Sequence, residues 1–471
     1  MFSLIKKIYA PPPFAAELPK DQIDRTYKRY RLQIFLVAYV GYLSYYFVRS
    51  TLALAKPSLM GITGKDVLHP ITGVSQTFDI QSLGFLGAGL AVTYGLSKFL
   101  MGNVSDRSNP RIFLATGLIL SAVVNIIFAN VFTFWIMLLL MLINGWAQGM
   151  GWPPCGRLMT HWFSDGERGT KMSIWNTAHN IGAGMLGPIV TLGLIIFSYS
   201  YVGIFYAPAI ISILIGIGVL IFGKDTPQSL GLPSIEHYKN DFPSADVEKG
   251  IHDREVELTG KEIFFKHVLN NKFVWFIAIA NAFVYLVRYG ILNWAPTYLE
   301  QVKGFSPGNA RWAFAIFEFA AIPGTILVGW MSDKIFAGRR APMGIFCMIG
   351  VFVFTLLYWF NPPGHPMLDI SFLGAIGFLI YGPVMLIGVS ALDLVPKKAA
   401  GTSAGFTGLF GYFLGTMGAE AVMGMIVQHS GWNGGFTLIA ASALLSILFL
   451  GLTWNVHDRT KYDPNHEHLA K

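Results

Sequence analysis

The chain has 471 residues and a formal net charge of +8; 53% of its residues are hydrophobic and only 13% are charged. A soluble chain of this length would form about three domains and would carry roughly 25% charged residues to cover them. The composition therefore argues against a set of soluble domains and indicates an integral membrane protein. Its two cysteines, Cys155 and Cys347, are too few for a disulfide framework or a CxxC metal site.

Apolar runs near the ~20 residues that a helix needs to cross a bilayer recur along the whole chain. We predict twelve transmembrane helices, so the predicted fold class is an all-α membrane protein. The predicted spans are 32–54, 81–101, 111–130, 132–156, 173–197, 200–222, 273–297, 311–331, 341–361, 369–392, 402–425 and 433–455.

Lys and Arg are concentrated in alternate connections between these spans. Of the 34 such residues, 27 lie in the N-terminal segment, the loops after even-numbered spans, the central segment and the tail. Because cytoplasmic loops carry the excess of Lys and Arg, both termini are predicted to be cytoplasmic. The net charge of +8 is then mostly a topology signal, and no nucleic-acid partner is predicted.

One long polar stretch, residues 223–272, separates six predicted spans from six. The first 31 residues contain three consecutive prolines and seven basic residues but no apolar core, so we expect no removable signal peptide. The predicted parts are a cytoplasmic N-terminal segment (1–31), an N-terminal six-helix half (32–222), a cytoplasmic central loop (223–272), a C-terminal six-helix half (273–455) and a cytoplasmic tail (456–471).

The two predicted halves share a motif at equivalent places. The matching triplets are Tyr42, Tyr46 and Arg49 in span 1, and Asn281, Tyr285 and Arg288 in span 7, 239 residues later. Positions spaced 0, +4 and +7 fall on one face of a helix. The repeat therefore predicts two equivalent helical faces, each with a tyrosine and an arginine.

A second repeat, Gly-x-x-x-Asp followed by a basic residue, comes after spans 2 and 8. Its Asp and basic residues are Asp106 and Arg107 in the first copy, and Asp333 and Lys334 in the second. An Asp beside a cation at a cytoplasmic helix end can hold neighbouring helices together. We interpret these four residues as structural or gating residues.

Three cations, Arg49, Lys98 and Arg288, have apolar sequence on both sides. A charge at mid-bilayer costs about 2.5–3.5 kcal/mol on insertion scales, which favours a functional role. The acidic residues available to the spans all lie in the second half: Glu318, Asp393 and Glu420. Uncompensated cations predict an anionic substrate, and a guanidinium matches phosphate with two parallel hydrogen bonds. The alternatives are a structural ion pair for the arginines and a snorkelling side chain for Lys98.

The remaining four cations fall at or beyond the outer span ends, where solvated loop charges are the expectation. They are Lys56, Lys65, Lys303 and Arg311.

Several polar side chains near the buried cations have hydroxyl or imidazole groups that could donate to a phosphate oxygen. Those on the same helices as the cations are Tyr42, Tyr46, Tyr94 and Tyr285. His179 in span 5 could donate as well, or it could be a packed histidine bonded to a neighbouring helix. Nothing in the sequence resembles a nucleophile–base pair, a nucleotide loop or a metal cage, so we predict no enzyme activity, no cofactor and no metal.

The sequence resembles the organophosphate:phosphate antiporters of the major facilitator superfamily, and among them the members that carry glycerol 3-phosphate. Both copies of the Gly-x-x-x-Asp loop belong to the signature of that superfamily. Further stretches that carry the resemblance are residues 31–35, 94–98, 105–111, 149–157, 175–180, 225–229, 381–388, 396–401 and 405–412.

The resemblance implies two pseudo-symmetric six-helix halves in the bacterial cytoplasmic membrane. It implies that external glycerol 3-phosphate is exchanged for internal inorganic phosphate by alternating access, without a cofactor or an obligate protein partner. In the family, the positions of Arg49 and Arg288 bind the phosphate, and those of Lys98 and His179 assist. Further pore-lining positions of the family match Tyr42, Tyr46, Tyr94, Asn176, Tyr285, Tyr381 and Tyr412.

This chain departs from the family at two charged positions. Members that carry glycerol 3-phosphate commonly have Lys directly after the first arginine and Asp five residues after the second. Here those positions are Ser50 and Asn293, while Glu318 remains at a third matching position. Gating by that pair is therefore not expected to carry over, and Glu318 is interpreted as a gating or structural residue.

Three other functions fit the motifs. A transporter-like membrane sensor of external organophosphate could share all of them. An antiporter could also carry phosphoglycerate or hexose phosphate, but the sugar-phosphate members have an Asp and a Lys in span 11 where this chain has Ala404 and Thr407. A proton-driven carrier is disfavoured because spans 1–6 contain no carboxylate.

Overall fold

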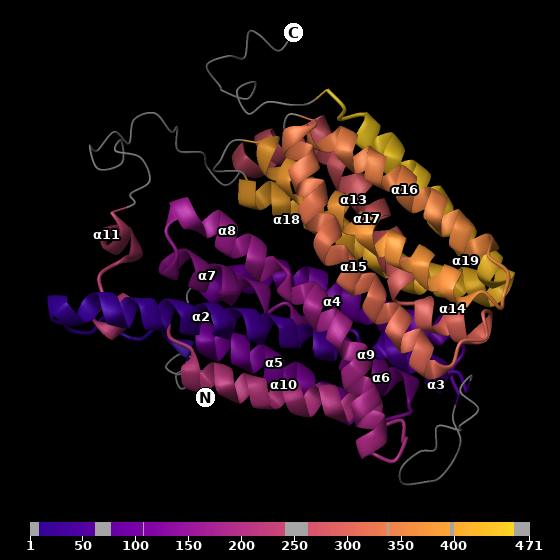
Figure 1. The fold of residues 1–471 in the computed structure, drawn as a ribbon, viewed down its shortest axis with the longest axis horizontal. Helices are drawn as coiled ribbons and strands as arrows, with labels where there is room; N and C mark the ends of the chain where they lie inside the picture. The colour runs from indigo at the N-terminus through magenta and orange to yellow at the C-terminus, as the bar shows by residue number, and fades with distance from the viewer. Residues whose placement is uncertain are drawn as a thin grey trace. The chain divides into compact units, whose positions relative to one another are not determined.

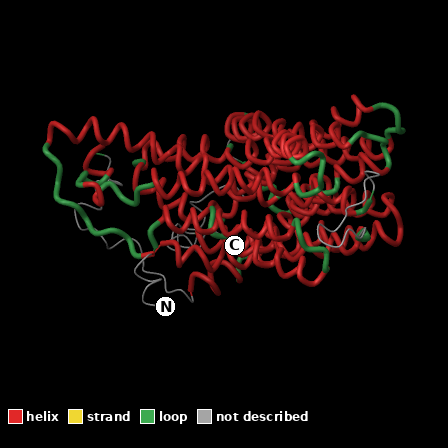
Figure 2. Tube along the Cα trace, turned by 90° about the horizontal axis from the view of Figure 1, so that it is seen from below, coloured by secondary structure: helices red, strands yellow, loops and turns green. Residues whose placement is uncertain are grey.

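The computed structural model describes residues 9–61, 77–106, 108–240, 262–336, 339–395 and 400–455. In these ranges all the regular structure is helical, as Figure 2 shows. Ten of the described helical segments are long and apolar enough to cross a membrane.

Figure 1 labels the α-helices. In the first part of the chain the helices are α2 (Lys20–Arg49), α3 (Thr51–Leu59), α4 (Ile80–Asp106), α5 (Pro110–Phe128), α6 (Phe134–Gln148), α7 (Trp152–Trp162), α8 (Asp165–Asn176), α9 (Ala178–Ile196), α10 (Gly203–Phe222) and α11 (Ile235–Lys239). In the second part they are η3 (Glu262–Leu269), α13 (Lys272–Leu292), α14 (Ala295–Gln301), α15 (Pro307–Lys334), α16 (Arg340–Phe360), α17 (Pro366–Asp393), α18 (Ala400–Phe410), η5 (Gly411–Thr416), η6 (Gly418–Val422) and α19 (Met423–Gly451).

Among the described residues there are ten candidate spans, against the twelve predicted, and the helices differ from the prediction at two places. The first predicted span is divided between α2 and α3, because α2 ends at Arg49 and Ser50 caps it. The last two predicted spans fall in one candidate, Thr402–Gly451. Gly431, with φ of 68° and ψ of −177°, breaks α19 in a backbone region that essentially only glycine adopts.

The helices form two compact units. The first comprises Met1–Thr51, Leu96–Ala129 and Leu142–Val256. Within it, α2 packs against α5, α9 and α10. Large aromatic side chains such as Trp162 and Trp175 are fully buried in its core. The hydroxyl of Tyr45 donates to the Leu114 carbonyl at 2.7 Å, which satisfies both groups away from water.

The second unit comprises Leu52–Gly95, Asn130–Met141 and Glu257–Lys471. Within it, α17 packs against both α15 and α16, and α13 packs against α19. Contact between α15 and α17 is so close that a Cβ atom at Gly324 would lie 1.9 Å from the Phe378 carbonyl oxygen. Small residues permit this close approach of helices in membrane proteins. The predicted boundaries of the two six-helix halves stay a prediction.

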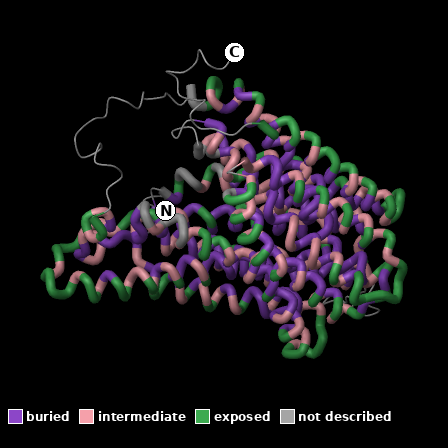
Figure 3. The backbone as a smooth tube through the Cα atoms, turned by 45° about the horizontal axis from the view of Figure 1, so that its top comes forward, coloured by how far each residue is buried: buried purple, intermediate pink, exposed green. Residues whose placement is uncertain are grey.

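Many large apolar side chains are exposed. Examples are Leu214 and Ile221 on α10, and Ile326 and Trp330 on α15. Figure 3 marks all exposed residues of the described chain in green. A soluble monomer rarely exposes so much apolar surface, whereas lipid chains can cover it at no cost. The exposed residues therefore agree with a protein that is embedded in a bilayer.

The first part of the predicted central loop packs against residues of α2 and α7. The Tyr238 ring stacks on the Tyr27 ring at 3.9 Å between centroids, and the Tyr27 hydroxyl donates to the Pro233 carbonyl. Arg157 forms an ion pair with Asp225 at 3.1 Å. The pKa of the Asp225 carboxyl is nevertheless raised, because burial outweighs the attraction of Arg157. These contacts fix residues 225–238 to the first unit.

We predict that Glu300 makes stability depend on pH. It lies on α14, outside the candidate spans, and burial raises its pKa to about 7 although Arg311 opposes the shift. A carboxyl whose pKa is higher in the folded state than in the unfolded state stabilises the fold when it is protonated. The stabilisation by Glu300 is therefore complete below about pH 4.5 and is lost as the pH rises through 7.

The expected gain on lowering the pH from 8 to 5 is on the order of 1 kcal/mol, since Glu300 is only partly buried. Unfolding in detergent at several pH values, compared between the native protein and Glu300→Gln, measures it. Parallel pH profiles for the two proteins would contradict this assignment.

Candidate functional site

The last turns of α2 carry three of the predicted site residues on one buried face. The rings of Tyr42 and Tyr46 lie 5.8 Å apart, and the Arg49 guanidinium lies over the Tyr46 ring at 4.4 Å. His179 of α9 contacts the same tyrosine, with 5.8 Å between the ring centroids. Trp175 stacks on Tyr42 at 4.7 Å. The first unit thus gathers a cation, two phenols and an imidazole in one place.

Lys98 is linked to this cluster through tryptophans. Its ammonium lies 5.9 Å from the centre of the Trp152 ring, and Trp152 meets Trp175 edge to face at 6.5 Å. The Lys98 side chain is half-buried. The sequence did not indicate Trp152, because this residue lies on α7, whereas Lys98 lies on α4, and helical spacing relates only residues of one helix.

Gln148, at the end of α6, is a further residue that the sequence did not indicate. Its side-chain oxygen accepts a hydrogen bond from Nε of Arg49 at 2.9 Å. Gln148 is fully buried. Nε of Arg49 therefore donates to a neutral acceptor.

In the second unit Arg288 is held by a chain of two acceptors. Its Nη2 donates to the Tyr381 hydroxyl at 2.7 Å, and that hydroxyl donates to both carboxylate oxygens of Glu318 at 2.6 Å. All three residues are buried. The negative charge of Glu318 thus compensates Arg288 indirectly. The Tyr381 hydroxyl lies between the two groups, and each of its hydrogen bonds polarises the other. The structural or gating role of Glu318 stays a prediction.

Aromatic rings surround Arg288. Its guanidinium lies 4.1 Å from the Tyr381 ring and 4.7 Å from the ring of Tyr289, a residue that the sequence did not indicate. Tyr412 contacts Tyr285 at 5.3 Å and Tyr94 at 4.6 Å. Tyr412 belongs to η5, a π-helical segment, and such irregular turns often occur at functional sites. Predicted tyrosines from three separate elements therefore meet.

The roles predicted for Tyr94 and Asn176 stay predictions. Tyr94 is four residues before Lys98, and this spacing suggested a joint role with that cation. In the structure the Tyr94 ring contacts Tyr412, and the Lys98 ammonium lies near the Trp152 ring. Asn176 is the last residue of α8 and is exposed.

The two Gly-x-x-x-Asp motifs lie at helix ends. Asp106 is the final residue of α4, and Lys334 is the final, exposed residue of α15, one after Asp333. Arg107 lies outside the described residues. Their gating or structural role stays a prediction.

Lys56 corrects an expectation, since it is not a solvated loop charge. It is fully buried on α3 and forms an ion pair with Glu420 of η6 at 2.7 Å. Its ammonium also lies 3.4 Å from the centre of the Trp294 ring. The expectation failed because α3, which follows the break at Ser50, is a second helix with an apolar sequence.

Asn293, one of the two departures from the family pattern, joins this ion pair. Its side-chain amide donates to Glu420 at 2.6 Å, and its backbone carbonyl accepts from Nζ of Lys56 at 3.5 Å. Two glycines of α4 make room, because a Cβ at Gly84 or Gly87 would lie 2.4 Å from an atom of Glu420. The family's charged pair is absent at positions 50 and 293, but the Lys56–Glu420 ion pair lies in contact with Asn293.

Lys303 corrects the same expectation. It is buried and pairs with Asp369 at 3.3 Å, and its ammonium donates to the carbonyls of Tyr358 and Asn361. The ammonium therefore ties the loop before α15 to the end of α16 and the start of α17. Arg311 is half-buried, and Lys65 lies outside the described residues.

The span-11 positions that set the expected substrate preference lie in α18. Thr407 is buried and donates to the Ala404 carbonyl at 3.0 Å, and its own carbonyl accepts from Asn281 at 2.8 Å. The Thr407 hydroxyl therefore already has a hydrogen-bond partner in its own helix. No charged side chain stands at either position.

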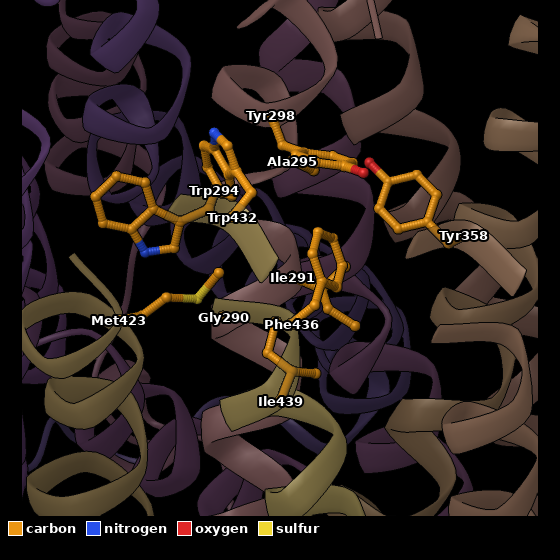
Figure 4. A pocket seen from close by; sticks show the side chains of 10 residues that line it. All are labelled: Gly290, Ile291, Trp294, Ala295, Tyr298, Tyr358, Met423, Trp432, Phe436 and Ile439. Atoms are coloured by element: carbon orange, nitrogen blue, oxygen red, sulfur yellow. The ribbon is translucent and has the colours of Figure 1, made fainter. Parts of the chain in front are cut away.

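A small pocket lies beyond Arg288 along α13 (Figure 4). Aromatic and aliphatic side chains such as Trp294, Tyr298 and Phe436 line it. Among its ten described lining residues there is no Lys, Arg or His. The lining of this pocket therefore offers no cation to a phosphate.

Comparison with known proteins identifies relatives over nearly the whole chain. The family model described as Major Facilitator Superfamily matches residues 38–419. A glycerol-3-phosphate transporter of Bacillus subtilis (strain 168) is 52% identical, over 97% of this chain and 99% of that protein. A glycerol-3-phosphate transporter of Haemophilus influenzae is 46% identical, over 93% and 94%.

Less similar proteins differ in what their names describe. A probable hexose phosphate transport protein of Chlamydia muridarum is 40% identical over 98% of this chain and 100% of that protein. The membrane sensor protein UhpC of Escherichia coli is 35% identical over 92% and 94%. A solved structure, a bacterial homologue of the lysosomal transporter Spinster, matches with a TM-score of 0.65 at 16% identity, over 91% of this chain and 96% of that chain. The predicted fold class is confirmed.

Proposed function

Because the chain belongs to the Major Facilitator Superfamily, we propose that it imports glycerol 3-phosphate through the bacterial cytoplasmic membrane in exchange for internal inorganic phosphate. Two relatives named glycerol-3-phosphate transporters, 52% and 46% identical, support this choice of substrate. One observation of the site carries the proposal. The matched arginines of the repeat, Arg49 and Arg288, are both buried among tyrosine rings.

In this proposal the two arginines bind the phosphate group, each through its planar guanidinium. Lys98 and His179 add donors, and a phenol or amide can donate to a phosphate oxygen without adding charge. The residues assigned to the pore are Tyr42, Tyr46, Tyr94, Asn176, Tyr285, Tyr381 and Tyr412.

Exchange follows from the charges. In the empty carrier two buried arginines face the site, and Arg288 is linked to Glu318 through the Tyr381 hydroxyl. A bound phosphate dianion neutralises both arginines and so lowers the cost of moving the site between the two faces of the membrane. A ligand that favours the transition in this way makes exchange obligatory without another coupling ion.

The decisive experiment uses purified protein in phosphate-loaded liposomes. Uptake of labelled glycerol 3-phosphate should require internal phosphate and should cease in empty liposomes. The sensor relative UhpC motivates the alternative function. A sensor would bind organophosphate in the same preparation but would not accumulate it.

We predict that glycerol 3-phosphate competes better than glucose 6-phosphate for exchange. Both carry the same dianion, so discrimination comes from the pocket around the organic part. Ala404 and Thr407 supply no charged partners, and the Thr407 hydroxyl is already bonded to the Ala404 carbonyl. A hexose would leave several hydroxyls unpaired, each at about 1 kcal/mol or more when buried.

The measurement is inhibition of labelled phosphate exchange by each compound over a range of concentrations. Phosphoglycerate belongs in the same panel. If glucose 6-phosphate inhibits at equal or lower concentration than glycerol 3-phosphate, the preference is wrong.

A further inference from the structure

The amide of Gln148 bridges Arg49 and the backbone of the helix that carries it. Its oxygen accepts from Nε of Arg49 at 2.9 Å. Its nitrogen donates to the Tyr45 carbonyl at 3.1 Å and to the Ser121 hydroxyl at 2.8 Å. All three bonds are buried, so water does not compete with them. Gln148 therefore uses its full amide to fix one arginine against α2.

The orientation of this amide is dictated by its partners. An arginine side chain has only donors, and a backbone carbonyl has only acceptors. The oxygen of Gln148 must therefore face Arg49, and its nitrogen must face Tyr45. A flipped amide would put donor against donor and acceptor against acceptor, so the guanidinium sees an acceptor in a single fixed place.

Further amides secure the end of α2 next to this contact. The side chains of Asn144 and Asn125 both donate to the Val48 carbonyl, at 3.2 and 2.9 Å. Asn144 also accepts from the Ser121 hydroxyl. The last carbonyls of a helix lack partners within the helix, and inside a membrane protein side chains must supply them. The turn that precedes Arg49 is thus held by a buried polar network.

We infer that Gln148 is a positioning residue that orients the Arg49 guanidinium for the phosphate, an inference that rests on the proposed function. A neutral acceptor orients the arginine and leaves its charge available to an anion. A carboxylate in the same place would neutralise that charge. Arg288 differs in its first acceptor, which is the Tyr381 hydroxyl that in turn donates to Glu318.

Two substitutions separate orientation from charge. Gln148→Met keeps the volume and removes the acceptor, so Arg49 loses its fixed orientation, and we expect phosphate affinity to fall about tenfold. Gln148→Glu keeps an acceptor and adds a negative charge beside the arginine. We expect it to weaken phosphate binding by about 100-fold, since a buried anion competes directly with the ligand.

Asn144→Leu provides the matched control. Asn144 lies in the same network, shares Ser121 and caps α2, but its amide bonds to Val48 and not to Arg49. This variant should lose thermal stability, as both Gln148 variants should, and should keep the native phosphate dissociation constant. The readouts are the dissociation constant by calorimetry, KM and turnover in liposomes, and the melting temperature in detergent.

The expected result is a loss of affinity in the two Gln148 variants, larger for Gln148→Glu, against none in Asn144→Leu. Native affinity in either Gln148 variant would overturn the inference, and so would an equal loss in the control. If the unsubstituted protein neither binds nor exchanges phosphate, the proposed function itself fails. Native exchange together with unaffected variants removes only the role of Gln148.

Discussion

Arg49→Lys and Arg288→Lys are each expected to remove most phosphate exchange while leaving the protein folded. A lysine keeps the charge, but it is a point donor that cannot make two parallel bonds to a phosphate. The native contacts would be lost as well, namely Nε of Arg49 to Gln148 and Nη2 of Arg288 to Tyr381. Hydrogen bonds to charged groups contribute about 1.5–3 kcal/mol, which corresponds to a fall of roughly 10- to 100-fold.

Exchange of labelled phosphate in liposomes measures this effect, with the amount of reconstituted protein held equal. Arg29→Lys is the matched control, because Arg29 is an exposed residue of the same helix α2 as Arg49. That variant should exchange at the native rate. Near-native phosphate self-exchange in either site variant would contradict the phosphate-binding role of its arginine.

The second large effect is expected at the buried ion pair. Lys56→Met should destabilise the fold by about 3–5 kcal/mol, because Glu420 would remain buried without its cation. The loss is limited if Glu420 takes up a proton, since Asn293 still donates to it. The double variant Lys56→Met, Glu420→Met should recover most of the loss, because an apolar pair of similar volume has no charge to desolvate.

A double-mutant cycle on the free energy of unfolding, measured by SDS titration in mixed micelles, tests this prediction. The two single variants and the double variant give the coupling energy directly. Additive effects of the two substitutions would show that the charges do not stabilise each other. Lys28→Met serves as a control, since Lys28 pairs with Asp24 at an exposed position where little loss is expected.

Part of the site was predictable because helical spacing is a local property. Tyr42, Tyr46 and Arg49 were placed on one face from their 0, +4, +7 spacing alone, and they lie there in contact. Nothing of this kind could indicate Gln148 or Trp152, because each reaches the cluster from another helix. Which helices pack together is decided by the whole core, and a single sequence does not display it.

The prediction failed at Lys56 for a different physical reason. The sequence alone gives only the distance of Lys56 from the centre of a predicted span, and a charge near a span end is expected to be solvated. Burial is decided by tertiary packing, and α3 turns residues 51–59 into a helix inside the second unit. Tyr381 and Tyr412 came from the family resemblance alone, and the structure places them beside Arg288 and Tyr285.

The close fit of Glu420 against α4 has a consequence for the history of this family. Gly87 has no room for a Cβ while the Glu420 side chain occupies its present place. A lineage that replaced Glu420 by a small residue would free that space and would also leave Lys56 without its partner. Residues 56, 87 and 420 should therefore covary among homologues, with a larger side chain entering at 87 where both charges have been lost.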